Sequence, residues 1–148
     1  MKIAIGNDHA GFMLKNTVIE HIKQLGHEVI DVGCHSEESC DYPIYAKKTC
    51  SEVVEKRVEL GILICGTGVG MSIAANKVKG IRASLCSDIF TAQMTREHNN
   101  SNVLVLAGRV ISKELAINII EKYLETKFSG DERHNRRLAM LEDENDRV

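Results

Sequence analysis

The sequence contains very few aromatic residues: it has no Trp, three Phe and three Tyr. Proteins that bind single-stranded nucleic acids usually stack the bases on aromatic side chains, so this class of function is disfavoured. The formal net charge is only −2, which provides no bulk attraction to nucleic acid or to an anionic membrane surface. No apolar run approaches the roughly 18 residues that a membrane-spanning helix needs. We therefore expect neither nucleic acid nor membrane as a partner.

Proline is also scarce. The single proline, Pro43, interrupts no β-prone run, and we place it in a polar loop before a helix. The chain starts with too short an apolar run for a secretory signal, MKIAIGNDHAGF. It contains no Cys-x-x-Cys pair, and its odd number of cysteines leaves at least one thiol unpaired in a monomer. We expect a cytoplasmic protein in which all five are reduced: Cys34, Cys40, Cys50, Cys65 and Cys86.

The length of 148 residues predicts one domain, residues 1–148. Apolar residues make up 43% and charged residues 27%, as in an ordinary globular protein. The C-terminal part, from about residue 129 to residue 148, is highly charged. We interpret it as a helical tail, with one more helix over Asn135–Glu144.

Short β-prone runs alternate with segments of helical periodicity. Apolar residues recur every three or four positions from Phe12 to Leu25, before Gly26, and again after a predicted N-cap at Ser112. This alternation predicts an α/β fold with a five-stranded parallel sheet. The predicted strands are Lys2–Gly6, Glu28–Val32, Leu60–Cys65, Ile81–Leu85 and Val103–Leu106.

In an open parallel sheet, ligands bind beyond the carboxyl ends of the strands. Polar and ionisable residues are concentrated after the predicted strands, which makes this edge the expected site. The segments concerned are Asn7–Gly11, Gly33, Gly66–Gly70, Cys86–Asp88 and Ala107–Arg109.

The segment after the third predicted strand has three alternate glycines, CGTGVGMS. It lacks the Gly-Lys-Ser/Thr of a nucleotide P-loop, and its glycine spacing differs from the dinucleotide fingerprint. Such a turn can present backbone N–H groups to an anion at a helix N-terminus, or it can be a tight structural turn. The glycines alone do not separate these two readings.

Cys65 lies at the end of that strand, facing the N–H groups. This position favours a thiolate, and therefore a general base or a nucleophile; the alternative is a buried core cysteine. We interpret the other four cysteines as core or loop residues. Cys34, His35 and Cys40 lie close in sequence, but they do not supply a tetrahedral metal-ligand set.

The remaining candidates are an Asp-His pair, a helix-end histidine and several arginines. Asp8 and His9 can bind sugar hydroxyls or phosphate, or can lie in a solvated loop. His98 at a helix C-terminus can act as a general acid, or can simply precede an Asn C-cap. Arginines bind phosphate in a bidentate manner, although in the charged tail they also fit a solvated helix. These residues are Asp8, His9, His98, Asn99, Arg109, Arg133, Arg136 and Arg137, with His134 beside them.

We call the backbone N–H groups of the turn Gly66–Gly70 the cradle. The candidates together fit one reaction, which is proton abstraction next to a carbonyl of a small phosphorylated sugar. It would use a thiolate base, the cradle, a helix-end histidine and arginines. Several segments, from about Lys2 to Leu138, resemble the type B ribose-5-phosphate isomerases, whose wider group includes galactose-6-phosphate and allose-6-phosphate isomerases. The segments that carry the resemblance are GNDHAG, DYP, GILICGTGVGMSIAANK, HNNSNVLVLAGR and RH..RR.

The resemblance implies a Rossmann-like three-layer αβα sandwich that forms a homodimer or homotetramer with sites between subunits. It also implies interconversion of ribose 5-phosphate and ribulose 5-phosphate in the pentose phosphate pathway, through an enediolate, without a metal or other cofactor. The alternatives are an isomerase of allose or galactose 6-phosphate, a non-catalytic sugar-phosphate-binding subunit, and a cysteine hydrolase.

The resemblance also assigns roles to residues. Cys65 is implied as the base, Thr67 as a supporting hydroxyl, and His98 as the acid that opens the furanose ring. The amides of Gly66–Gly70 are implied to hold the enediolate. The substrate-binding residues are then Asp8, His9, Tyr42, Gly66, Gly68, Val69, Gly70, Asn99, Arg109, Arg133 and Arg137.

Overall fold

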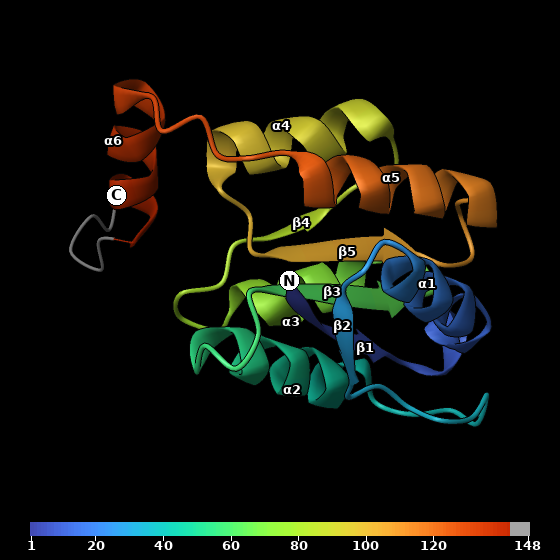
Figure 1. Cartoon of the computed structure of the whole chain (residues 1–148). Helices are drawn as coiled ribbons and strands as arrows, with labels where there is room; N and C mark the ends of the chain where they lie inside the picture. The colour runs from blue at the N-terminus through green and yellow to red at the C-terminus, as the bar shows by residue number, and fades with distance from the viewer. Residues whose placement is uncertain (143–148) are drawn as a thin grey trace.

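The computed structural model describes residues 1–142 and places five strands in one parallel sheet (Figure 1). Their order across the sheet is β2-β1-β3-β5-β4, which confirms the predicted five-stranded parallel sheet. The strands are β1 (Lys2–Asn7), β2 (Glu28–Asp31), β3 (Leu60–Cys65), β4 (Ala83–Leu85) and β5 (Val103–Ala107).

Helices cover both faces of the sheet. In Figure 1, α4 and α5 lie on one side of the strands, and α2 and α3 lie on the other. The helix α1 packs beside α5. The helices are the short 3-10 helix η1 (His9–Gly11), α1 (Phe12–Gln24), α2 (Tyr42–Val54), α3 (Val69–Asn76), α4 (Ile89–Asn99), α5 (Lys113–Glu125) and α6 (Glu132–Glu142).

Alternate residues of the central strands β1, β3 and β5 enter two separate hydrophobic clusters. In β3, Ile62 and Ile64 pack with α1, α4 and α5, whereas Leu63 and Cys65 pack with α2 and α3. Both faces of the central strands are therefore buried, which explains their continuous apolar sequences. The predicted three-layer αβα sandwich is confirmed, and the side chain of Cys65 lies on the α2–α3 face.

The register of the strands brings their carboxyl ends level. Asn7 of β1 pairs with Ile64 of β3, and Cys65 pairs with Ala107 of β5. The chain runs outward to β2 on one side of β1 and continues to β3 on the other side. This is a topological switch point, where loops from adjacent strands diverge and leave room for a ligand.

Several boundaries differ from the sequence prediction. By one residue each, β1 and β5 end later than predicted, at Asn7 and Ala107, and β2 ends earlier, at Asp31. Pro43 lies in the first turn of α2 rather than in a preceding loop; its missing N–H costs nothing there. The strand β4 begins at Ala83 rather than Ile81, because the N–H of Ile81 donates to Val78 in a turn. The helix α6 begins at Glu132, three residues before Asn135, and the predicted end at Glu144 lies outside the described residues.

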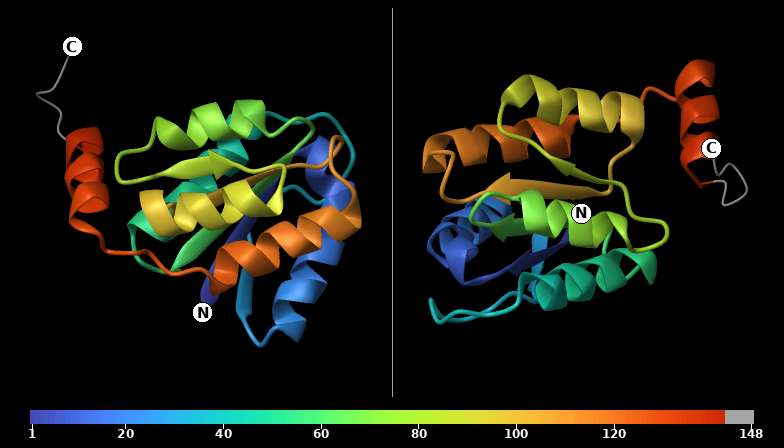
Figure 2. Two further views of the ribbon diagram at one scale, coloured as in Figure 1. Left: turned by 90° about the horizontal axis from the view of Figure 1, so that it is seen from above. Right: turned by 180° about the vertical axis from the view of Figure 1, so that it is seen from behind.

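The helix α6 stands away from the sheet, beyond the amino ends of the strands (Figures 1 and 2). An extended segment after α5 leads to it, held by a hydrogen bond from the Ser129 N–H to the Glu97 carbonyl of 2.9 Å. Among residues 1–142, no helix has the length and apolar character to cross a membrane.

Candidate active site

The glycine-rich turn after β3 begins a helix directly beneath Cys65. Gly68 is the N-cap of α3 and has a φ of +77°, which favours glycine. A Cβ atom at this position would lie 2.3 Å from Cδ1 of Leu85, so steric room also requires glycine. The first bond inside the helix runs from Ser72 N–H to the Gly68 carbonyl, at 3.0 Å. The amides that precede Ser72 therefore point out of the helix end, as the sequence predicts.

The thiol of Cys65 is buried, with 5% of the residue exposed, and it faces these amides. Burial raises the pKa of the Cys65 thiol, and the carboxylate of Asp8 raises it further. Hydrogen bonds from the amides of Met71, Gly68 and Thr67 lower it, but the net pKa shift is upward. The predicted N–H donors are confirmed. The predicted preference for the thiolate is wrong for the single chain, because desolvation outweighs the amides.

Asp8 is fixed next to this cradle by the backbone. Its N–H donates to the carbonyl of Ile64 at 3.2 Å, which ties it to β3. Its Oδ1 accepts from the N–H groups of Ala10 and Gly11, at 2.9 Å and 3.1 Å, and so caps the short helix η1. The carboxylate is therefore buried beside Cys65 and already has a structural role, which the sequence analysis did not predict.

His9 and Arg109 line a cavity of about 330 Å³ at the same edge of the sheet. Nδ1 of His9 accepts a hydrogen bond from the N–H of Cys40 at 3.3 Å, so the proton of the neutral ring lies on Nε2. The backbone of Arg109 is tied to the glycine turn by a 3.0 Å bond to the Gly66 carbonyl. The cavity is lined by His9, Ala10, Met13, Glu37, Gly108 and Arg109.

Tyr42 and Thr67 also belong to this group. A Cβ atom on Gly70 would lie 2.9 Å from Cζ of Tyr42, so the phenol ring rests directly on the first turn of α3. The hydroxyl of Thr67 accepts from the N–H of Val69 at 3.4 Å, and Thr67 is exposed. The structure thus brings together, at the carboxyl edge, the predicted residues Asp8, His9, Tyr42, Cys65, Gly66, Thr67, Gly68, Val69, Gly70 and Arg109.

The other predicted residues lie at the opposite edge of the sheet. The helix α4 starts after β4 at the carboxyl edge and runs back to Asn99, just before β5 begins at Val103. Cys65 is level with the end of β5, and five strand residues span roughly 13 Å. Within one chain, His98 and Cys65 cannot share a small substrate. Asn99 and the α6 residues Arg133 and Arg137 lie with His98 at the amino edge.

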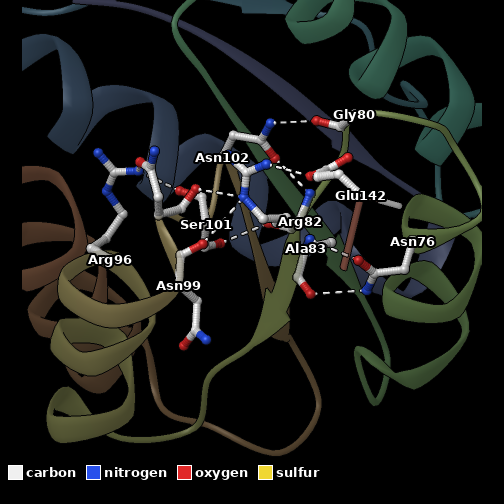
Figure 3. Close-up of polar contacts among 10 residues, drawn as sticks. Asn76, Gly80, Arg82, Ala83, Arg96, Asn99, Ser101, Asn102 and Glu142 are labelled. Atoms are coloured by element: carbon white, nitrogen blue, oxygen red, sulfur yellow. Dashed lines mark hydrogen bonds and ion pairs between the residues drawn. The ribbon is translucent and has the colours of Figure 1, made fainter. Parts of the chain in front are cut away.

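An arginine that the sequence analysis did not single out organises this amino edge (Figure 3). Nε of Arg82 donates to the carbonyls of Asn99 and Asn100, at 3.2 Å and 3.1 Å. Its Nη1 contacts the carboxylate of Glu142 at 2.7 Å, which links the C-terminus of α4 to α6. Arg82 is the second residue of the predicted strand Ile81–Leu85, so no periodicity or motif marks it as part of a site.

His134 is the second residue of this edge whose role the sequence left open. It is buried, and its Nδ1 lies 2.7 Å from the hydroxyl of Ser129. Burial lowers the pKa of His134, and the neighbouring His98 and Arg133 lower it further. The ring therefore favours its neutral form and anchors α6 beside His98. Within residues 1–142, no group of three or more His, Cys, Asp or Glu side chains is arranged to hold a metal ion.

Comparison with known proteins identifies the family. Residues 3–141 match the model of the family described as Ribose/Galactose Isomerase. The chain belongs to the ribose/galactose isomerase family. Among its relatives in this family, the ribose-5-phosphate isomerase B of Escherichia coli K12 is 49% identical over 140 residues, covering 95% of this chain and 93% of that protein. The protein of the same name from Mycobacterium leprae is 39% identical and covers 95% and 88%.

Solved structures of the family have the same fold. The ribose 5-phosphate isomerase of Thermotoga maritima superposes with a TM-score of 0.93 at 50% identity, covering 95% of this chain and 97% of that one. The ribose-5-phosphate isomerase B of Clostridium thermocellum gives a TM-score of 0.94 at 46% identity, with coverage of 96% and 95%. The fold of this family member is therefore the fold of those isomerases.

Proposed function

We propose that this protein is a cytoplasmic isomerase that interconverts ribose 5-phosphate and ribulose 5-phosphate. The observation that carries the proposal is the thiol of Cys65 at the end of a central strand, facing three amide N–H groups at the N-terminus of α3. The named relatives act on a five-carbon sugar phosphate, which favours ribose over allose or galactose phosphates. Five free thiols suit a reducing compartment.

In the proposed reaction, Cys65 acts as its thiolate, which is the minor form in the single chain because burial raises the pKa of the thiol. The thiolate removes the proton from C2 of the open-chain aldose. The electron pair moves into the carbonyl, and the negative charge passes from sulfur to an enediolate oxygen. The Cys65 sulfur and the enediolate oxygen both lie near the N-terminus of α3. The backbone N–H groups there stabilise the negative charge before and after it moves. The proton of the C2 hydroxyl moves to the oxygen on C1, so the negative charge passes to the oxygen on C2. Return of the proton from sulfur to C1 then forms the C2 carbonyl of the ketose and restores the thiolate.

Asp8, His9 and Arg109 are proposed to bind the substrate at the carboxyl edge. His9 presents a ring N–H on Nε2 because Nδ1 is occupied by the Cys40 amide. A carboxylate and an N–H donor are suited to sugar hydroxyls, and the guanidinium of Arg109 is suited to phosphate. The cavity of about 330 Å³ between His9 and Arg109 lies at the low end of ordinary ligand sites.

Opening of the furanose ring requires an acid, for which we propose His98 of a second copy. The two edges of one chain are too far apart to meet on a pentose phosphate, so a second chain must bring its amino edge to the Cys65 cradle. Asn99, Arg133 and Arg137 would arrive with that edge and contribute hydroxyl and phosphate contacts. The proposed assembly is therefore a homodimer, alone or paired into a tetramer, with sites between subunits.

An exposed apolar surface next to the cradle supports this assembly. Val69 and Ile73, one helical turn apart on α3, are 50% and 58% exposed. Phe90, at the start of α4, is 68% exposed, and Leu85 of β4 lies against Gly68. Apolar side chains that border a functional site are typical of a surface covered by another chain.

The decisive experiment incubates the protein with ribose 5-phosphate, with and without a chelator, and measures ribulose 5-phosphate. We expect turnover in both conditions. Parallel assays with allose 6-phosphate and galactose 6-phosphate, compared as kcat/KM, should favour the pentose. Binding of ribose 5-phosphate without exchange of its C2 proton with solvent would instead establish a non-catalytic subunit, and a trapped acyl-enzyme would establish a hydrolase.

A further inference from the structure

A second pair of thiols lies beside the candidate site and has no part in the proposed reaction. Cys34 and Cys40 belong to the loop between β2 and α2, and both are free. Both cysteines are held by the segment Asn7–His9: the Cys34 N–H donates to the Asn7 carbonyl, and the Cys40 N–H donates to Nδ1 of His9. After burial, the Cys40 thiol also contributes to the raised pKa of the Cys34 thiol. Burial, and then Cys40, raises the pKa of the nearby Tyr45. Six positions apart in the sequence, the two cysteines thus lie together beside the Asn7–His9 segment.

Cys34 is held firmly in place. Its N–H donates to the Asn7 carbonyl at 3.0 Å, and its carbonyl accepts from the buried ammonium of Lys15 at 2.6 Å. Its sulfur accepts from Nδ2 of Asn7 at 3.2 Å and donates to the Ser36 carbonyl at 3.4 Å. Only 5% of Cys34 is exposed, and this burial raises the pKa of its thiol. Cys34 is therefore suited to react second, with a partner sulfur that is brought to it.

Cys40 is the more accessible thiol and lies beside a base. Its Sγ is 3.9 Å from Nδ1 of His9, and its N–H donates to the same nitrogen. The imidazole can take the thiol proton, and the thiolate is the form that attacks oxidants. Any displacement of Cys40 also changes the hydrogen bond that fixes the His9 ring.

We propose that Cys34 and Cys40 form a disulfide when the protein meets hydrogen peroxide, and that this bond disturbs His9. The Cys40 thiolate attacks one peroxide oxygen, which forms an S–O bond, breaks the O–O bond and releases hydroxide. The Cys34 thiolate then attacks the sulfenic sulfur, which forms the S–S bond and expels the second hydroxide. Two thiols lose two electrons and two protons, and one peroxide becomes two waters. A dithiol reductant reverses the reaction.

The effect on activity rests on the proposed function of His9 as a substrate-binding residue. Closure of the disulfide moves the Cys40 backbone toward Cys34 and withdraws the amide that holds Nδ1 of His9. A displacement of about 1 Å in a binding group can cost about 100-fold in rate, so we expect a 10- to 100-fold fall in kcat/KM. Cys65 is buried in its own cradle and is not part of this pair.

The bond itself is tested by mass spectrometry of the full-length protein, treated with peroxide, alkylated and digested. Both cysteines lie on one tryptic peptide, residues 24–47, with Glu37 and Glu38 between them. A second cleavage after these glutamates leaves two pieces that only a disulfide can hold together. We expect the joined species after peroxide and its loss after reduction. The proposal is overturned if Cys34 and Cys40 are still found alkylated, and therefore reduced, after a peroxide treatment that oxidises other thiols of the protein.

Activity is measured on the same samples. In the wild type we expect peroxide to lower the activity and reductant to restore it. The control Cys86→Ala should behave in the same way, because Cys86 is buried on the other face of the sheet from Cys65. Cys34→Ser and Cys40→Ser should lose this reversible component. A disulfide without loss of activity would refute the effect on His9, whereas absence of isomerase activity in the reduced protein would refute the proposed function and leave the disulfide readout valid. Alkylation of Cys65 is followed on its own peptide, residues 58–77.

Discussion

The imidazole rings of His98 and His134 lie 4.4 Å apart between centroids, tilted by 37°. They come from α4 and α6, so this contact connects a proposed catalytic residue to the helix that carries the proposed phosphate-binding arginines. His134 is the buried member of the pair, and its surroundings include Ser129, Asp131, Arg133 and Arg137.

The docking of α6 should weaken in acid. The folded-state pKa of His134 is lowered below its ordinary value by burial and by His98, so the folded state binds fewer protons than the unfolded state. The stabilising effect is complete above the unfolded pKa of about 6.5 and is lost as the pH falls through the folded pKa. We expect faster amide hydrogen exchange in α6 at pH 5 than at pH 7.5, relative to the intrinsic rates. His134→Gln should remove this difference in exchange, and the control His27→Gln should keep it. The same pH dependence of exchange in the wild type and both variants would contradict the prediction.

Replacement of Cys65 by alanine should remove the base and leave the fold intact. General acid–base groups contribute about 10²–10⁴-fold, so kcat should fall by at least this factor. The circular dichroism spectrum should stay unchanged, because alanine fits the space of a cysteine. Cys86→Ala, another buried cysteine, is the control and should retain turnover. Unchanged activity in Cys65→Ala would eliminate the proposed mechanism.

A site shared between chains predicts complementation. Cys65→Ala and His98→Ala should each be inactive on the cyclic substrate. After mixing, unfolding and refolding together, half of the dimers should be mixed, and each mixed dimer has one intact site. The expected recovery is about a quarter of the wild-type activity. No recovery, with mixed dimers demonstrated by mass, would mean that each site is built from a single chain.

Gly68→Ala should damage both stability and activity. A φ of +77° costs an alanine about 1–2 kcal/mol, and the new Cβ would collide with Leu85. Gly26 has a φ of +82° with open space around it, so Gly26→Ala is a matched control that carries the backbone cost alone. We expect both variants to melt earlier, and only Gly68→Ala to lose kcat. Equal kcat values in the two variants would show that the cradle tolerates displacement.

Arg82→Met should impair ring opening more than proton transfer. Without the guanidinium, the carbonyls of Asn99 and Asn100 lose their donor and the end of α4 loses its anchor. The variant should therefore turn over the cyclic substrate more slowly, whereas C2 proton exchange in an open-chain analogue should be spared. Arg57→Met, which removes only ion pairs on the surface, serves as the control. A parallel loss in both assays would indicate general destabilisation.

The parts of the fold that rest on continuous apolar runs could be predicted from the sequence. The bounds of β3, Leu60–Cys65, were predicted to the residue because both faces of the strand are buried and the glycine turn follows at once. The start of α6 was predicted three residues too late. Its first residues, from Glu132, are polar and show no apolar periodicity, and the helix begins with hydrogen bonds from the N–H groups of His134 and Asn135 to the Asp131 carbonyl.

The site was predictable only as two lists of residues. Position after a strand indicated that Asp8 and Cys65 lie together, since parallel strands share an edge. The same reasoning could not show the burial that raises the pKa of Cys65, nor the contact of Arg82 with α6, which depends on a side chain that crosses between distant segments. The proximity of Cys34 to Cys40 was hidden for the same reason: a loop without periodicity folds back on itself.

The placement of His98 and Cys65 at opposite ends of the sheet also has a kinetic consequence. On the proposed assembly, a free chain holds every functional group and yet completes no turnover. Specific activity then depends on the total chain concentration, rising with the fraction of associated chains and reaching a plateau only above the dissociation constant. Dilution therefore switches the enzyme off reversibly, because mass action dissociates the chains without any effector.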